Sequence, residues 1–283
     1  MTFTDPDILV VGSLLVLVLA IGLDATVDDL FHILQRPRLL IRGVLSVNVI
    51  VPIAAGLLTA LFPQPPAVKA GILLMAISAI PPTLPKDELE AGAPRAYAYG
   101  LYLALALLTV AVVPLAVRIA GHVYGVEARL PIETAALKVG LYVILPLAFG
   151  LWVRQQAPRL ASRIARRIWK LSMLLLVIGE APVLVTTWPI MLSLLGSGAV
   201  TLMALLTVVS LAAGHLLGGP HPGKRGALAL ASATRHPAIA TTLAHAYIGD
   251  PQTLATILLY LIVSMLIAEP YKTWIRRQVR ESE

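Results

Sequence analysis

Residues 70–80 (AGILLMAISAI) form an uninterrupted apolar run, and Pro81-Pro82-Thr83-Leu84-Pro85 follows it directly. A proline removes a backbone N–H and clashes with the preceding helical turn, so this run predicts a helix that breaks near residue 81. A second apolar stretch, residues 227–234, runs into Arg235-His236-Pro237 in the same way. Freed backbone groups at membrane depth are tolerated only where they face protein or a watery cavity. The two breaks therefore predict a buried functional site.

The composition places these breaks in a membrane protein. Of the 283 residues, 58% are hydrophobic and 13% are charged, with a mean hydropathy of +0.85. Soluble domains are about 45–50% apolar and about 25% charged, so a soluble domain, a disordered chain and a nucleic-acid binder are all excluded. The chain has no cysteine, which excludes disulfides and thiolate metal sites. We expect an all-α polytopic membrane protein that forms a single transmembrane domain over residues 1–283.

Nine apolar stretches are long enough to be membrane spans. They lie near 8–24, 39–61, 67–92, 95–118, 132–153, 170–188, 190–217, 226–248 and 252–271, with a turn expected at Trp188-Pro189 between the sixth and the seventh. With the N-terminus outside, 16 Lys and Arg residues fall in inward connections and 3 in outward ones, which predicts an N-out, C-in topology. The basic segment 154–170 is either an amphipathic helix on the cytoplasmic leaflet or a solvated loop.

The sequence also contains an internal repeat with an offset of 156 residues. At this offset Lys69 meets Arg225, Pro81 meets Pro237 and Pro114 meets Pro270. The repeated spans are separated by an odd number of spans, so corresponding helices run in opposite directions. Inverted repeats with interrupted helices are typical of secondary transporters. We expect residues 39–118 and 195–271 to be the two repeat halves of a core, with the two discontinuous helices crossing at its centre.

The early part of the chain resembles the bile acid:sodium symporter family. The resemblance rests on Gly22-Leu23-Asp24-Ala25-Thr26, Asp28-Asp29-Leu30, Arg36-Pro37-Arg38, Asn48 and Pro52, and it extends to about residue 272 through Ala231–Ala240 and Gly249-Asp250. It implies a core domain with two crossing helices and a panel domain, here residues 8–35 and 132–188. The first span carries the motif of the family's second helix, so we expect the chain to lack a counterpart of the family's first helix.

The crossing region departs from the family pattern. Lys86 and Asp87 stand where the resemblance implies Ser-Asn, and Ser232 stands where it implies a sodium-binding glutamate, with Arg235 three residues later. Three interpretations of Lys86 and Arg235 remain open: they replace a bound sodium ion, they bind an anionic substrate, or they only neutralise nearby acids. The further candidates for substrate binding or ion substitution are Thr83, Ser232, Thr234, His236 and Asn48.

Three carboxyl groups are candidates for coupling transport to protons: Glu180, Asp87 and Glu88. Glu180 lies in an otherwise apolar span, where an ionisable residue is a functional hypothesis by default. The six histidines show no metal-binding spacing, and no cofactor motif is present, so we expect neither a metal nor a cofactor.

The sequence thus favours a secondary transporter of a small organic anion that works by alternating access. Coupling to sodium in the family's usual manner is not expected, although a sodium-coupled symporter is the first alternative. An intramembrane enzyme or a non-transporting sensor is the alternative from another class. The expected partners are the anionic substrate, the lipid bilayer and H⁺ or Na⁺, and the expected location is the bacterial inner membrane.

Overall fold

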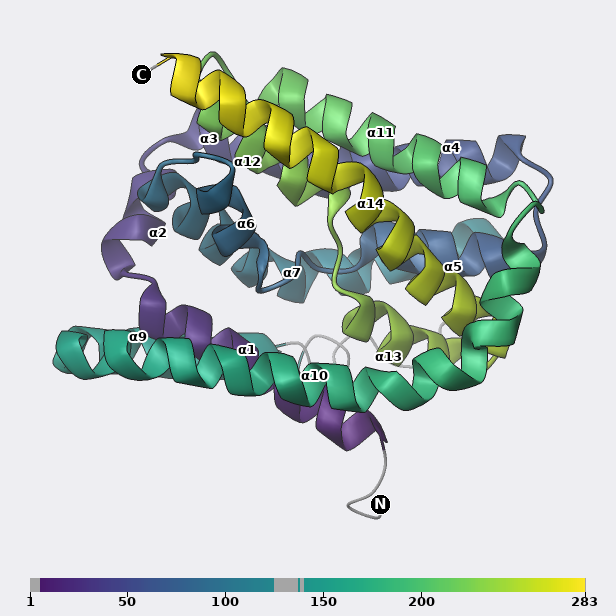
Figure 1. The fold of residues 1–283 in the computed structure, drawn as a ribbon, viewed down its shortest axis with the longest axis horizontal. Coiled ribbons are helices and arrows are strands. Elements are labelled where there is room, and N and C mark those ends of the chain that lie inside the picture. Colours follow the sequence, from purple (N-terminus) through teal and green to yellow (C-terminus); the bar gives the residue numbers. More distant parts are fainter. Residues whose placement is uncertain (1–5, 125–136, 138–139, 283) are drawn as a thin grey trace. The chain divides into compact units, whose positions relative to one another are not determined.

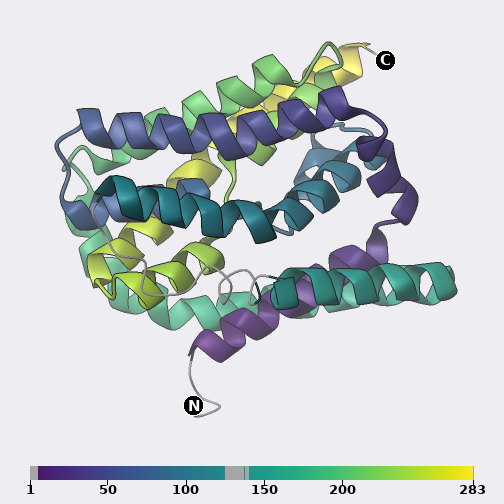
Figure 2. The ribbon, with the colours of Figure 1, turned by 180° about the vertical axis from the view of Figure 1, so that it is seen from behind.

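The computed structural model describes residues 6–124, 137 and 140–282, and every regular element in these ranges is a helix (Figures 1 and 2). In chain order these are α1 (Pro6–Asp24), α2 (Val27–Leu34), α3 (Pro37–Val44), η1 (Leu45–Ile50), α4 (Val51–Leu61), α5 (Pro66–Ile77), α6 (Leu84–Glu90), α7 (Arg95–Tyr124), η2 (Gly140–Ile144), α9 (Leu145–Gln156), α10 (Pro158–Leu194), α11 (Ala199–Leu217), α12 (Pro222–Ala233), α13 (Pro237–Tyr247) and α14 (Pro251–Ser282).

Within the described residues, five helical stretches are long and apolar enough to cross a membrane. These are Pro37–Leu61, Arg95–Ala116, Pro158–Leu194, Ala199–Leu217 and Pro251–Ser282. The expectation of a helical membrane protein is confirmed to this extent. The start of the expected span at 132–153 lies largely outside the described residues.

The chain divides into two compact units. Unit 1 contains residues 1–29 and 106–186, and unit 2 contains residues 30–105 and 187–283. The division differs in detail from the core and panel ranges expected from sequence, because residues 30–35 group with unit 2 and residues 106–118 with unit 1. Three helices, α2, α7 and α10, contribute residues to both units.

In unit 1, α1 packs closely against α9 through two glycines. A Cβ added at Gly22 would lie 2.6 Å from the Leu147 carbonyl oxygen, and one added at Gly150 would lie 2.7 Å from the Leu19 carbonyl oxygen. Only glycine allows such an approach, and small residues at helix contacts are a common device in membranes. Leu23, the neighbour of Gly22, is buried against Ala161 and Ala165 of α10.

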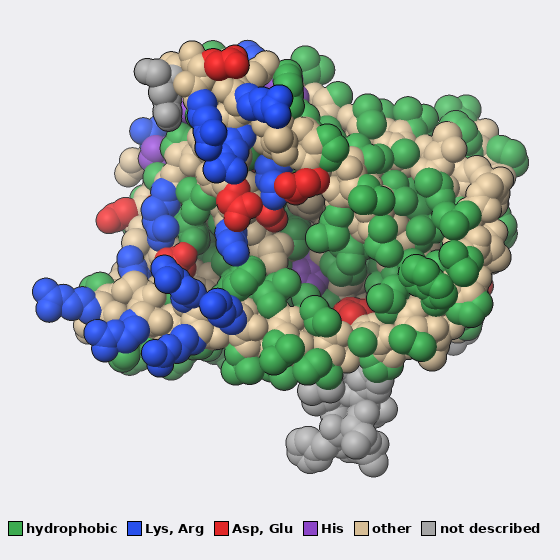
Figure 3. Space-filling view, in the orientation of Figure 1, with side chains coloured by type: hydrophobic (Ala, Val, Ile, Leu, Met, Phe, Trp, Pro, Cys, Tyr) green, Lys and Arg blue, Asp and Glu red, His purple; other side chains and the backbone are tan. Residues whose placement is uncertain are grey.

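The helix α10 corrects two expectations from sequence. It is continuous over 37 residues, so the turn expected at Trp188-Pro189 is absent and residues 154–170 do not form a separate surface helix. At a rise of 1.5 Å per residue α10 is about 55 Å long, well beyond the ~30 Å of a hydrocarbon core. Its first turns carry exposed basic side chains (Figure 3), while Ala161 and Ala165 of the same turns pack against Leu23 of α1.

The turn after α10 lies at residues 195–198 rather than at Pro189. Gly196 and Gly198 have positive φ values of 85° and 83°, a backbone conformation that favours glycine. The Gln64 side chain donates to the Ser197 carbonyl at 3.0 Å and ties this turn to the loop before α5. The chain therefore turns at these glycines and not at Pro189. A proline inside a helix removes only one hydrogen bond and adds a local clash, so α10 continues past it.

In unit 2, the helix boundaries follow the 156-residue offset. The offset maps Pro66–Ile77 onto Pro222–Ala233, which are the bounds of α5 and α12, and it maps the first residue of α7 onto the first residue of α14. It also maps the end of α4 at Leu61 onto the end of α11 at Leu217. Four helix boundaries thus match in three pairs of helices. Together with the two proline pairs and the Lys69/Arg225 pair, these matches support an internal repeat rather than a chance similarity.

The helices of unit 2 pack tightly where side chains are small. A Cβ added at Gly214 of α11 would lie 2.3 Å from the Leu228 carbonyl oxygen of α12, and one added at Gly71 of α5 would lie 2.7 Å from the Thr256 side chain of α14. The second half of each broken helix packs against the first half of the other, since α6 contacts α12 and α13 contacts α5. This arrangement brings the two breaks together.

Candidate functional site

The two helix breaks are joined by a backbone hydrogen bond. The first broken helix ends at Ile77 and resumes at Leu84, and the second ends at Ala233 and resumes at Pro237. The backbone N–H of His236, in the second break, donates to the carbonyl of Ala79, in the first, at 2.8 Å. Unwound backbone groups thus satisfy one another across the two segments, as buried polar groups must.

Arg235 lies at this contact and its side chain is almost completely enclosed, with 3% of its surface exposed. One terminal guanidinium nitrogen donates to the carbonyl of Ser78 at 3.3 Å, and the other donates to the carbonyl of Val47. The Nε atom has no hydrogen-bond partner among the described residues. The cation therefore binds two neutral carbonyl oxygens, one from η1 and one from the break after α5, and the structure describes no carboxylate hydrogen-bonded to it.

The free carbonyl of Val47 has an identifiable cause in the sequence. Val47 lies in η1, a π-helical segment in which the N–H of Val51 bonds to the carbonyl of Ser46, five residues earlier. The next donor in this register belongs to residue 52, which is a proline without an N–H. Pro52 therefore leaves the Val47 carbonyl without a helical partner, and this carbonyl accepts a hydrogen bond from Arg235 instead. Single π-helical turns occur frequently at functional sites.

Ser232 belongs to the same buried region. Its hydroxyl lies 2.7 Å from the hydroxyl of Ser46 on η1 and also donates to the carbonyl of Leu228 at 2.8 Å. Both serines are buried, with 1% or less of their surface exposed. Their pairing joins α12 to η1 one helical turn before Arg235, so the two elements are held together by both residues.

The remaining predicted residues take different positions around the breaks. His236 is buried, and its Nδ1 accepts from the N–H of Ala238 at 3.2 Å, which caps α13. Thr234 donates back to the carbonyl of Leu230 at 2.7 Å. Thr83 precedes α6 without a capping side-chain bond. Asn48 lies beside Val47 on η1, and its side-chain nitrogen is buried without a hydrogen-bond partner among the described residues.

The structure separates the two predicted cations. Lys86, on α6, has an exposed side chain, whereas Arg235 is buried between the breaks. Only Arg235 is buried at the contact between the breaks, so the cost of burying a cation applies to Arg235 alone. The physical reason is that Lys86 follows the break by nearly a full turn of α6, on its outer face.

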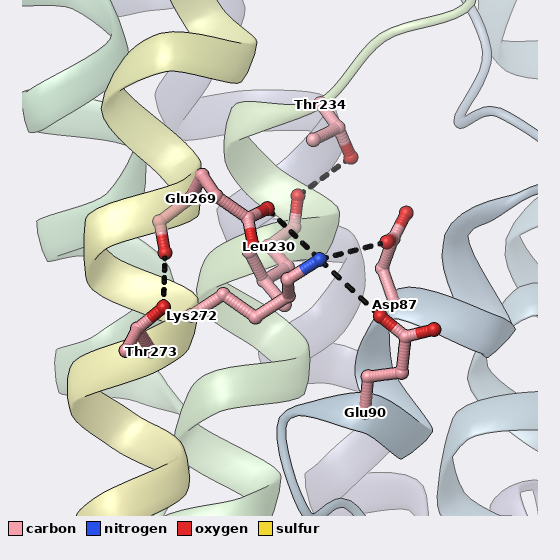
Figure 4. A network of polar contacts seen from close by, with 7 residues as sticks. All are labelled: Asp87, Glu90, Leu230, Thr234, Glu269, Lys272 and Thr273. Carbon is pink, nitrogen blue, oxygen red and sulfur yellow. Dashed lines mark hydrogen bonds and ion pairs between the residues drawn. The ribbon is translucent and has the colours of Figure 1, made fainter.

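A different lysine binds the acidic residues of α6. Lys272 of α14 lies 3.3 Å from Asp87, 3.4 Å from Glu90 and 2.9 Å from Glu269 (Figure 4). This network fixes α6 to α14 at one end of unit 2. Glu180 lies in unit 1, on α10, with an intermediate exposure. Glu88, between Asp87 and Glu90, is completely buried.

With the geometry described, the comparison with known proteins identifies the family. Residues 11–188 match the model of the sodium bile acid symporter family, which is more than half of the chain. The chain belongs to this family. It is therefore a membrane transport protein, because this is a family of transporters rather than of enzymes. No curated protein matches the chain.

Sequence reasoning found Arg235, Ser232 and His236 but missed their partners. The carbonyls of Val47, Ser78 and Ala79 carry no signal in side-chain identity, because any residue supplies a carbonyl. Pro52 was noted only as part of the family pattern, although its missing N–H is what releases the Val47 carbonyl. Lys272 was missed because 182 or more residues separate it from its partners on α6.

Proposed function

We propose that this protein is a secondary transporter of a small organic anion that works by alternating access, with Arg235 permanently occupying the place of a coupling cation. The single observation that carries the proposal is the binding of the Arg235 guanidinium to the carbonyls of Val47 and Ser78. Backbone carbonyls of broken helices are the ligands that bind sodium in many transporters. A guanidinium held by the same type of ligand supplies the positive charge without an ion.

The direction of the guanidinium donors favours this interpretation of Arg235 over direct binding of a substrate. Arginine recognises a carboxylate best through two parallel N–H donors. Here both terminal nitrogens are used by carbonyls inside unit 2, and the side chain is 97% enclosed. The substrate anion would benefit from the positive charge at close range without a bidentate contact. Sodium-coupled symport remains the alternative in the same class.

The boundaries of the helices support the transport mechanism. The repeat of α4, α5 and α7 by α11, α12 and α14 is the expected construction of a secondary transporter core. We assign unit 2 to the core and unit 1 to the panel, and we propose that the core moves against the panel during transport. We propose nine spans in a bacterial inner membrane, and the positive-inside distribution supports an N-out, C-in orientation of them.

Counterflow in proteoliposomes tests this function without any assumption about the coupling ion. Vesicles containing the purified protein are loaded with unlabelled cholate, pyruvate and succinate, and entry of each labelled anion is measured. Entry above that of protein-free vesicles for at least one anion is expected. Arg163→Gln, an exposed change on α10, is the matched control and should behave like the unmodified protein. Entry equal to that of protein-free vesicles for every anion would contradict the proposed function.

A further inference from the structure

Glu88 is the one group of the acidic α6 run Asp87–Glu90 that the Lys272 network does not explain. Its side chain has no exposed surface, and neither carboxyl oxygen has a hydrogen-bond partner among the residues that the structure describes. Its neighbours differ, since the side chains of Asp87 and Glu90 are 40% and 49% exposed and both bond to Lys272. Within four residues, one short helix therefore carries two partly exposed carboxylates paired with Lys272 and one enclosed, unpaired carboxyl group.

The charges around Glu88 do not neutralise it. The charged group that acts on its carboxyl is Asp87, which has the same sign. Tyr97 of α7 is its other titratable neighbour. The nearby cations have different partners: Lys272 of α14 bonds to the other acids, and Lys224 of α12 lies 5.9 Å from the centre of the Tyr97 ring. Arg42 of α3 likewise acts on Tyr97.

An ionised carboxylate in such a position costs a large free energy, because it has lost its water and gained neither a counter-ion nor hydrogen bonds. Two ligands could remove this charge. A sodium ion needs several oxygen ligands besides a single carboxyl group, and the described residues include no group of three or more acidic or histidine side chains that could hold a metal ion together with Glu88. A proton needs only one oxygen, and its binding converts the carboxylate into a neutral carboxylic acid. The geometry therefore favours a proton.

We propose that Glu88 is a proton-binding site, and that this transporter takes up one H⁺ on Glu88 and releases it during each transport cycle. The proposal rests on the function proposed above. There Arg235 takes the place of a coupling cation at the crossover, so another ion must drive transport, and here that ion is H⁺. In the described state the carboxyl is protonated. On release the O–H bond breaks, the proton passes to water, and the carboxylate is hydrated. Buried carboxyl groups are the usual components of proton relays in membrane proteins.

The first test is infrared spectroscopy of the purified full-length protein in lipid at neutral pH. The C=O stretch of a protonated carboxyl group is expected in the unmodified protein and should disappear in Glu88→Gln. It should persist in Glu90→Gln, the matched change at an exposed position of the same helix. Because glutamine has the shape of a neutral carboxyl group, Glu88→Gln should also keep the melting temperature. Absence of the band, its survival in Glu88→Gln, or a marked fall in melting temperature of that variant would overturn the proposal.

The second test is accumulation of labelled cholate, pyruvate and succinate in proteoliposomes under an imposed pH gradient. With one H⁺ per anion, a gradient of about one unit, acidic outside, supports roughly tenfold accumulation of the transported anion. Glu88→Gln should lose this accumulation but retain counterflow. Counterflow without gradient-driven accumulation in the unmodified protein would refute proton coupling and leave the proposed function standing. Loss of counterflow in the unmodified protein would refute both.

Discussion

The guanidinium of Arg235 binds the carbonyl of Val47, which is the carbonyl that Pro52, five residues later, cannot bond. A proline on one span thus creates the acceptor for a cation on another. The relationship connects the π-helical turn of η1, the break before α13 and the burial of Arg235 in one arrangement. The described ligands of the buried Arg235 cation are thus neutral carbonyl oxygens.

Removal of this cation should destabilise the protein. Arg235→Ala leaves the carbonyls of Val47 and Ser78 buried without a donor, and each unsatisfied group costs about 1–3 kcal/mol. We expect a clear fall in melting temperature, partly reversed by added sodium but not by potassium. Arg163→Gln, which changes an exposed arginine, should have little effect. An unchanged melting temperature in Arg235→Ala would show that the two bonds contribute nothing.

Pro52 and Arg235 should be energetically coupled. Pro52→Ala supplies the N–H that Val47 lacks, so the carbonyl gains a competing donor and the bond to Arg235 weakens. The change should lower the melting temperature of the unmodified protein but not that of Arg235→Ala, where no bond remains to be lost. A double-mutant cycle on melting curves measures this difference. Strictly additive effects would mean that the proline and the arginine act independently.

The contact between α1 and α9 should not tolerate a larger residue at Gly22. An added methyl group would lie 2.6 Å from the Leu147 carbonyl oxygen and 3.0 Å from the Cα of Gly150. Gly22→Ala should therefore cost about 1–3 kcal/mol through overpacking. Gly12→Ala on the same helix is the control, because nothing lies within 4 Å of its added methyl group. Equal melting temperatures for the two variants would argue against this packing.

The orientation can be tested with single cysteines, because the chain has none of its own. A cysteine in place of the exposed Gln156, before α10, should resist an impermeant thiol reagent in intact cells. A cysteine in place of the exposed Pro65, before α5, should react with it. Both should react after the membrane is opened. Strong labelling at position 156 in intact cells would reverse the topology.

These residues also show what the sequence could and could not predict. Prolines and apolar runs are local signals, so both helix breaks and most helices were located without a structure. The length of α10 could not be predicted, because Pro189 looked like the end of a helix, whereas the glycines at which the chain turns lie several residues later. The candidate site was only half predicted, since Arg235 carries a visible signal whereas its carbonyl ligands do not. Lys86 was placed at the site from sequence position alone, and its direction on α6 needed the fold.

The most direct test of a fixed cation at Arg235 is anion uptake measured with sodium replaced by potassium at constant ionic strength. Vesicles containing the unmodified protein should take up the transported carboxylate at the same initial rate in both salts. Uptake by Arg235→Ala, where an ion could enter the vacated carbonyl ligands, should become dependent on sodium. Saturable stimulation of the unmodified protein by sodium would contradict the central claim, because a site filled by Arg235 has no place for the ion.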